Sequence, residues 1–179
     1  MIKKVIIDKN FILKVLKKKK INSNIKKQIF KLKNQHYKFS IKKQLKWFEE
    51  NINSDDYHNL LFSKKVLIGY NCLRSMEIFI TTKKNIIKKN IYLFDTLVLN
   101  KEFRNIGLSK KIMINSNKII LNKKCMGLLF CNNKMIDYYS KFDWKFLKKE
   151  QVISKRSSRL NAMIFNFNNK ENKIFSLKV

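Results

Sequence analysis

The segment EFRNIGLSKKI, residues 102 to 112, contains one of only three glycines in a chain of 179 residues that has no proline. A strand is predicted to end near Asn100 and a helical apolar pattern begins near Gly107, so this glycine stands where a loop enters a helix. Such a junction presents unpaired backbone N–H groups and the positive end of the helix dipole, which suits a pyrophosphate. Gly107 lets the backbone approach the anion without a Cβ, and Arg104 adds a guanidinium. The simpler interpretation is a helix start with a flexible glycine, because R-x-x-G-x-S arises often by chance.

A carboxylate stands inside an apolar strand. In YLFDTLVL, residues 92 to 99, strict alternation puts Asp95 on the same face as Leu93, Leu97 and Leu99. A carboxylate among apolar side chains is unfavourable unless it has a partner, so Asp95 is a candidate functional residue. The alternative is a structural Asp that is hydrogen-bonded to a neighbouring loop.

Two helices and a block of strands precede Asp95. Apolar spacing predicts one helix over residues 24–33 and a second that begins after Ser40, a good N-cap, with the stripe Ile41, Leu45, Phe48 and Ile52. Three predicted strands follow, with a polar run at residues 81–90 before the third: HNLLF (58–62), KVLIGYNCL (65–73) and NIYLFDTLVLN (90–100).

Beyond residue 100, helices and strands alternate. The predicted elements are a helix over 107–121, a strand over 125–131, a helix over 134–142 capped by Asn132 or Asn133, and closing strands over 144–147 and 161–168. The order of helices, a meander, βαβα and a final hairpin predicts a mixed-sheet α/β domain that spans residues 1–179.

The composition bounds the class of protein. Cys72, Cys125 and Cys131 lie in apolar runs and match no zinc spacing, so we expect reduced core cysteines and no metal. The first 20 residues lack the apolar region of a signal peptide, and no stretch approaches the ~18 apolar residues of a membrane span. We therefore expect a soluble, cytoplasmic protein that has no membrane partner.

The formal net charge of +29 suggests a polyanionic partner on first inspection. However, Lys, Asn, Ile and Phe are abundant while Ala occurs once, at Ala162, which is typical of a coding sequence rich in A and T. Part of the charge therefore reflects base composition, and nucleic acid is not the partner that we expect.

The surroundings of Gly107 resemble a known motif. LVLNKEFRNIGLSKKIM, residues 97 to 113, resembles the acetyl-CoA-binding motif V-x-P-x-x-R-G-x-G-x-G of the GNAT superfamily of acyl-CoA N-acyltransferases. Arg104 and Gly107 match its Arg and its central Gly, and Ser109 stands where a small residue is preferred. Lys101 and Asn105 depart from the Pro and the Gly of the pattern.

A second segment resembles the other signature of the superfamily, a strand that ends in Asn and is followed by YYEKxGF. In LLFCNNKMIDYYSKFDWKFL, residues 128 to 147, the matching positions are Asn132, Tyr139, Lys141 and the final aromatic Trp144. Asp143 replaces a Gly, which is tolerable because Asp enters left-handed conformations more readily than most residues. The resemblance is best supported over residues 64–147. Within the superfamily, this chain looks similar to small-molecule and aminoglycoside N-acetyltransferases.

This resemblance implies a fold, a donor and an activity. The fold would be α/β (α+β), GNAT-like, with a mixed, mostly antiparallel central sheet flanked by helices. The reaction would transfer an acetyl group from acetyl-CoA to a primary amine of a small molecule, an amino sugar being one candidate. The donor would be held by Leu97, Val98, Leu99, Arg104, Asn105, Ile106, Gly107, Leu108, Ser109 and Asn132.

The resemblance also assigns catalytic roles. Asp95 would be a general base, directly or through water, or an anchor for a cationic amine. Tyr139 would give a proton to the CoA sulfur, whereas Tyr138 holds an apolar position and is expected in the core. The backbone N–H of Val98, near a splay that this fold has in its fourth strand, would polarise the thioester carbonyl.

Acceptor contacts and assembly are less constrained. His58, near a strand start, and Glu77, expected at the end of the third strand, are candidates to line the acceptor site, whereas Trp47 is expected to pack. The alternative to an enzyme is a non-catalytic acyl-CoA-binding or basic nucleic-acid-binding module on the same fold. The oligomeric state stays open, with a homodimer as one option.

Overall fold

The computed structural model describes residues 3–6, 10–82, 85–154, 156, 159–167 and 174–176. The chain divides into two compact units, the first of Met1–Arg74 and Asp95–Ser116 and the second of Ser75–Phe94 and Asn117–Val179. Two long strands, β4 (Val66–Thr81) and β5 (Ile86–Leu99), contribute residues to both units.

The first unit combines strands with three helices. Its remaining elements are β1 (Lys3–Ile6), β2 (Phe11–Lys17), α1 (Ser23–Asn34), α2 (Ile41–Asn51), β3 (Tyr57–Ser63) and the first part of α3 (Leu108–Asn122). Strands β1 to β4 pair antiparallel in chain order.

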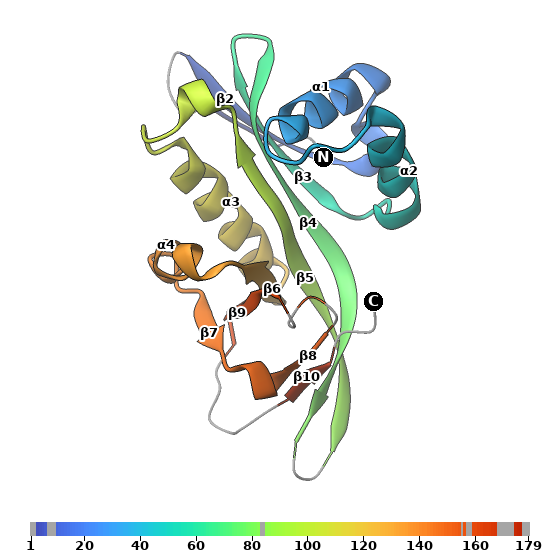
Figure 1. The fold of residues 1–179 in the computed structure, drawn as a ribbon, viewed down its shortest axis with the longest axis vertical. Coiled ribbons are helices and arrows are strands. Elements are labelled where there is room, and N and C mark those ends of the chain that lie inside the picture. The colour runs from blue at the N-terminus through green and yellow to red at the C-terminus, as the bar shows by residue number, and fades with distance from the viewer. Residues whose placement is uncertain are drawn as a thin grey trace. The chain divides into compact units, whose positions relative to one another are not determined.

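Besides the end of α3, the described part of the second unit contains short strands and a short helix. These are β6 (Met126–Cys131), α4 (Ile136–Ser140), β7 (Lys145–Leu147), β8 (Val152–Ile153), β9 (Asn161–Phe165) and β10 (Ile174–Ser176). β6 pairs parallel with β5 and antiparallel with β9. The strands pair in the order β1-β2-β3-β4-β5-β6-β9-β7, with β10 beside β4 and β8. Figure 1 labels β2 to β10. The expected fold class, a mixed and mostly antiparallel sheet flanked by helices, is confirmed.

Alternating strand residues give the first unit two apolar layers. One layer, called here the α1–α2 layer, joins helix residues to the strand residues Leu60, Phe62 and Val98. The other, the α3 layer, joins Leu108 and Ile112 of α3 to the strand residues Leu61, Ile68 and Leu99. Because neighbours in a strand point to opposite faces, α1 and α2 cover one face of this unit's sheet and the start of α3 covers the other.

A bulge and a glycine shape the α3 layer. The register of β3 and β4 shifts between Leu61 and Phe62, which leaves Ile68 as an extra residue on β4. At Gly69 a Cβ would lie 2.8 Å from Leu99 Cδ2 and 3.0 Å from Ile112 Cδ1. Gly69 is therefore required by the close approach of these side chains.

Both early helices are where the sequence predicts them, with caps that explain their starts. α1 follows Asn22, whose side chain accepts the N–H of Ile25 at 2.9 Å, and α2 follows Ser40, whose Oγ accepts the N–H of Lys43 at 3.2 Å. The predicted stripe of α2 is partly wrong, because Ile41 and Leu45 are 58% and 42% exposed. Gln44 is buried in their place. Its side-chain amide donates to the carbonyl of Phe39 and to Asn34, and these bonds satisfy a polar group on the buried face of α2.

The strands differ from the prediction in length and number. β4 and β5 continue through the polar run at residues 81–90, apart from a turn that includes Thr82 and Asn85. Glu77 is therefore inside β4 and not at its end, and it pairs with Lys88 of β5 at 2.7 Å. Strands β1 and β2 were not predicted, because lysines interrupt their apolar pattern. The short strands β8 and β10 were not predicted either.

His58 of β3 is enclosed in the first unit. Its side chain is fully buried, its Nδ1 lies 2.9 Å from the hydroxyl of Tyr70, and its ring stacks near Phe48 and Tyr70. The pKa of His58 is lowered from 6.5 to about 3, because burial disfavours the imidazolium and because Lys18 and Lys17 are close.

This burial predicts a pH dependence of stability. His58 is neutral in the folded state but gains a proton below pH ~6.5 when unfolded, so its contribution is complete above that pH and is lost as the pH falls toward 3. We expect wild type to lose about 3 kcal/mol more than His58→Gln between pH 7 and pH 4. Denaturant unfolding of both proteins at the two pH values measures the difference. Equal losses in the two proteins would contradict the assignment.

Candidate active site

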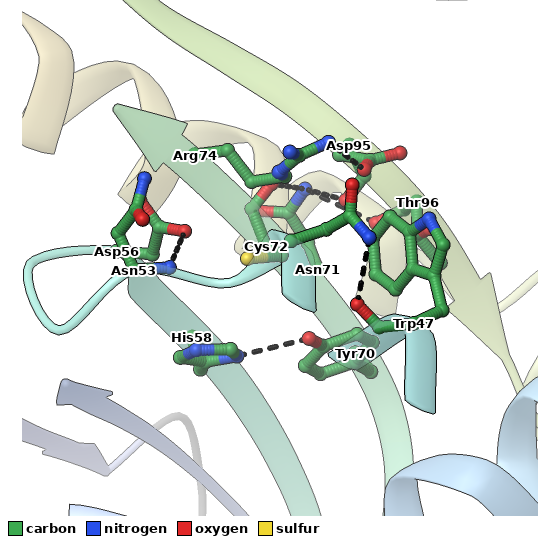
Figure 2. Close-up of polar contacts among 11 residues, drawn as sticks. Trp47, Asn53, Asp56, His58, Tyr70, Asn71, Cys72, Arg74, Asp95 and Thr96 are labelled. Atoms are coloured by element: carbon green, nitrogen blue, oxygen red, sulfur yellow. Dashed lines mark hydrogen bonds and ion pairs between the residues drawn. The ribbon is translucent and has the colours of Figure 1, made fainter. Parts of the chain in front are cut away.

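Asp95 on β5 has a charged partner. Its Oδ2 lies 3.3 Å from Nη1 of Arg74 on β4, and the side chains of Asp95 and Arg74 are 14% and 9% exposed. Figure 2 shows the pair. A charge-assisted hydrogen bond of this kind stabilises a carboxylate that is largely removed from water. The partner of Asp95 is thus a side chain on the neighbouring strand and not a loop.

Aromatic and cationic side chains from the helical region surround this ion pair. The guanidinium carbon of Arg74 lies 5.2 Å from the ring centroid of Trp47, and Nζ of Lys33 lies 4.9 Å from the same ring. Burial lowers the pKa of Lys33, an effect that Asp95 partly offsets. Burial and the charge of Asp95 raise the pKa of Tyr37. Trp47 packs against the α1–α2 layer, as predicted, and in addition supports two cations beside Asp95.

The backbone of β5 changes its alternation directly after Asp95. Leu97 and Leu99 pack in the α3 layer, whereas Asp95 pairs with Arg74 above Trp47 of α2. The prediction that Asp95 shares a face with these leucines is therefore wrong. The cause is Thr96, whose φ of 60° breaks the alternation. Such a conformation costs a β-branched residue about 1–3 kcal/mol, so Thr96 is a strained position.

The loop before α3 has the backbone that the glycine pattern predicts. Gly107 has a φ of 78°, and no heavy atom lies within 4 Å of the place that a Cβ would take. Asn105, which replaces a motif glycine, has a φ of 63°. No hydrogen bond joins the backbone N–H groups of residues 105–108 to any other described residue. These N–H groups, which precede or open α3, can therefore receive an anion.

Arg104 is docked on His36, at the end of α1. Its Nη2 lies 3.1 Å from each ring nitrogen of His36, and Nε2 of His36 lies 2.9 Å from the carbonyl oxygen of Leu99. A carbonyl oxygen only accepts, so Nε2 carries a proton, and Nδ1 is left to accept from Arg104. The exposed guanidinium of Arg104 is thereby held next to the loop that contains Gly107.

The other predicted donor-binding residues differ in exposure. Ile106 is 60% exposed, whereas Val98, Leu99 and Leu108 are buried. Leu97 and Ser109 are half-buried. Contacts of the buried residues with a ligand would be limited to their backbone groups.

The second signature lies in the second unit. Asn132 is exposed after β6 and precedes the short 3-10 helix Asn133–Met135. Tyr139 is 8% exposed and packs edge-to-face on Phe94, with ring centroids 6.0 Å apart. Tyr138 is only half-buried, so the expectation that it is the core ring of the pair is wrong. The cause is that α4 begins only at Ile136 after the 3-10 turn, which brings Tyr139 against Phe94.

Two residues of the second signature are explained by local geometry. Asp143 has a φ of 65°, which confirms the expectation that it takes the left-handed conformation of the motif glycine. Trp144 is 1% exposed, and its indole N–H donates to Asn117 Oδ1 at 3.0 Å. Trp144 is thus a core residue of the second unit.

The two acceptor-site candidates are not supported by their surroundings. His58 is fully buried between Phe48 and Tyr70, so the prediction that it lines an acceptor site is corrected to a structural role. Glu77 is exposed and pairs with Lys88, which occupies its carboxylate in a solvated ion pair.

Several residues of the site were missed by sequence reasoning. Arg74 stands in the apolar run of β4 as Asp95 stands in β5, and a charge in each strand would have been a usable signal. Asn71, whose Nδ2 donates to the carbonyl of Thr96 at 3.1 Å, looked like an ordinary strand residue. Lys33 and Tyr37 gave no signal, because surface helices are rich in such residues.

The described part of the chain holds no group of three or more His, Cys, Asp or Glu side chains that could bind a metal ion. None of its helices has both the length and the apolar character needed to cross a membrane.

Comparisons with known proteins connect this site to a fold. No family model and no curated protein matches the sequence. Among solved structures, ElaA of Escherichia coli is similar with a TM-score of 0.60 and 11% identity over 92% of this chain and 99% of that chain. An acyl-CoA N-acyltransferase from Pseudomonas aeruginosa has a TM-score of 0.59 and 11% identity over 85% and 95% of the two chains. Arabidopsis thaliana Naa50, in complex with the bisubstrate analogue CoA-Ac-MVNAL, has a TM-score of 0.59 and 12% identity over 87% and 99%.

These similarities cover most of each chain at low identity, so they concern the fold. The solved structures agree with the two sequence signatures around Gly107 and Tyr139 in indicating the same fold. The chain has the fold of the GNAT superfamily of acyl-CoA N-acyltransferases.

Proposed function

We propose that this protein is an acetyl-CoA-dependent N-acetyltransferase that acts on a primary amine of a small molecule, with an amino sugar as one candidate acceptor. The observation that carries the proposal is the loop before α3, where Gly107 is left-handed and the N–H groups of residues 105–108 have no partner within the described chain. The fold supports acyl transfer in general terms, since a solved structure of similar fold is named an acyl-CoA N-acyltransferase.

In the proposed reaction, the amine nitrogen attacks the thioester carbonyl carbon. The new N–C bond forms, the C–S bond breaks, the nitrogen loses a proton and the thiolate gains one. The backbone N–H of Val98 would stabilise the negative charge that develops on the carbonyl oxygen. The pyrophosphate of CoA would lie against the loop at residues 104–109, with Arg104 as a further positive charge.

Asp95 would contact the acceptor amine. Its ion pair with Arg74 fixes the direction of the carboxylate, which is useful both for anchoring a cationic amine and for accepting its proton, directly or through water. The nearby ring of Trp47 adds an apolar surface on which the carbon skeleton of an acceptor can pack.

Tyr139 would be the proton donor to the departing thiolate. A phenol is a weaker acid than a thiol, so a free thiolate would not readily take its proton. The proton is therefore transferred while the C–S bond breaks and charge builds up on the sulfur. Its ring makes edge-to-face contacts with Phe94 and Tyr138, which restrict the directions in which the hydroxyl can point.

The experiment that tests the proposal is release of the CoA thiol from acetyl-CoA with amino sugars, aminoglycosides, polyamines and peptides as acceptors. Release that depends on both substrates, with a mass increase of one acetyl group on the acceptor, supports it. A protein that ignores CoA and binds RNA with a steep salt dependence would instead support the alternative of a basic nucleic-acid-binding module. Binding of CoA without turnover of any amine would support a non-catalytic acyl-CoA-binding module.

The first prediction for this site concerns Gly107. Gly107→Val has room for the side chain, but a β-branched residue resists a φ of 78°, so the loop should leave its anion-binding conformation. We expect the Kd for CoA to rise by more than about tenfold, since the pyrophosphate loses several N–H donors at once. Isothermal titration measures it, with Ile114→Val on the exposed side of α3 as the control. An unchanged Kd would remove the loop from the donor site.

The second prediction concerns Asp95. Asp95→Asn keeps the shape and removes the charge, so turnover should fall by on the order of 10²-fold while CoA affinity stays nearly intact. Asp55→Asn is the matched control, because this carboxylate is 84% exposed in the same unit. Steady-state kinetics at saturating acetyl-CoA separates the two effects. Wild-type turnover in Asp95→Asn would return Asp95 to a structural role.

The third prediction concerns Tyr139. Tyr139→Phe removes one oxygen from a ring that keeps its packing on Phe94, so folding should be little affected while kcat falls by on the order of tenfold or more. Tyr138→Phe, on the neighbouring half-buried ring, should be nearly silent. If Tyr138→Phe is the sensitive variant, the assignment of the second signature is shifted by one residue and must be withdrawn.

A further inference from the structure

A fully buried polar network lies in the first unit, on the α3 side of the sheet. Asn59, Asn71 and Ser116 are each 0% exposed. Nδ2 of Asn59 donates to Oδ1 of Asn71 at 3.0 Å and to Oγ of Ser116 at 3.1 Å. Oγ of Ser116 donates to Oδ1 of Asn71 at 3.0 Å. Polar groups at such depth are unfavourable unless they are hydrogen-bonded, and these bonds satisfy them.

The orientation of the Asn71 amide is determined by these bonds. Its oxygen receives two donors, from Asn59 and Ser116, so its nitrogen points the other way, toward β5. There Nδ2 lies 3.1 Å from the carbonyl oxygen of Thr96 and 3.4 Å from that of Asp95, and carbonyl oxygens only accept. Figure 2 shows Asn71 beside both residues. Asn115 completes the arrangement, because its Nδ2 donates to Oδ1 of Asn59 at 2.7 Å.

The bonded carbonyls flank the strained residue of β5. Thr96 has a φ of 60°, which a β-branched side chain rarely adopts. Strained conformations persist only where their surroundings determine them, and the amide of Asn71 is the side chain that bonds the Thr96 carbonyl. The left-handed Thr96 in turn places Asp95 on the α1–α2 side and Leu97 on the α3 side.

We propose that Asn71 is a positioning residue for acyl transfer: it holds Thr96 left-handed and thereby directs the Asp95 carboxylate and the Val98 N–H into the active site. The inference rests on the proposed function. Without the amide, β5 relaxes toward regular alternation, and Asp95 turns toward the face that Leu97 occupies. The loss is in the geometry of the catalytic groups and not in the loop that binds CoA.

The test is a double-mutant cycle between Asn71→Leu and Thr96→Gly. Leu has a similar size but no donor, so we expect kcat to fall by at least about tenfold while the KM for acetyl-CoA changes by less than about threefold. Glycine adopts a positive φ without strain, so Thr96→Gly alone should stay close to wild type. In the double mutant, the Thr96→Gly change should recover at least half of the decrease in log kcat that Asn71→Leu causes. Ser116→Ala is the control, because it removes one network bond but leaves in place the Asn59 bond that orients the Asn71 amide and the Asn71 bond to the Thr96 carbonyl.

A second measurement is independent of turnover. Amide hydrogen exchange of peptides that cover residues 93–99 should accelerate in Asn71→Leu and return toward wild type in the double mutant. If Asn71→Leu does not fold, Asn71→Ser replaces it in the same cycle, since its hydroxyl is too short to reach both β5 carbonyls.

The outcomes separate this inference from the proposed function. An active wild type with equal kcat in Asn71→Leu and Ser116→Ala, or with no rescue by Thr96→Gly, overturns the role of Asn71 alone. A wild type that transfers no acetyl group to any amine overturns the proposed function and the catalytic role of Asn71 together. Rescue of both kcat and hydrogen exchange by Thr96→Gly supports the inference.

Discussion

The first unit depends on one backbone conformation, the left-handed Thr96 near the C-terminal end of β5. A regular strand would put Asp95 and Leu97 on one face, so one of them would be in the wrong environment. The positive φ at Thr96 resolves this conflict, because the leucines after it reach the α3 layer while Asp95 stays opposite. Apolar packing on one face and a carboxylate on the other are thus consequences of the same dihedral angle.

The charged groups around Asp95 stabilise one another. Arg74 and Lys33 both approach the ring of Trp47, and Asp95 supplies the negative charge that pairs with Arg74. Without Asp95, a guanidinium that is 9% exposed would lose its counter-charge, which is far more unfavourable than the loss of a surface ion pair. The many exposed lysines of the +29 chain matter less here, because salt screens exposed charges beyond about 8–10 Å. The electrostatics of the site are therefore local.

Sequence reasoning succeeded where a residue type has one strong local preference. Ser40 and Asn132 precede helical turns, and Gly107 has a positive φ. The apolar pattern after residue 100 predicted α3, β6, α4, β7 and β9, but not the short strands β8 and β10. Sequence reasoning failed where tertiary contacts outweigh the local preference of a residue. No propensity places a threonine at positive φ, since the stabilising amide comes from Asn71, 25 residues away in the chain. The burial of Gln44 in place of Leu45 likewise depends on contacts with Asn34 and Phe39 that a helical period does not encode.

The same distinction explains how a superfamily fold can persist when its glycines are lost. Asn105 and Asp143 stand at two motif positions where glycine is usual, and both have a positive φ, 63° and 65°. Asn and Asp are the non-glycine residues that enter this region most readily, so the requirement at these positions is on the dihedral angle and not on the residue. A chain whose composition favours Asn over Gly can meet that requirement at little free-energy cost. Gly107 keeps the glycine at a φ of 78°, and a Cβ there would have open space around it. Under the proposed function an anion approaches the N–H groups of the loop through that space, so a side chain at this position would obstruct it.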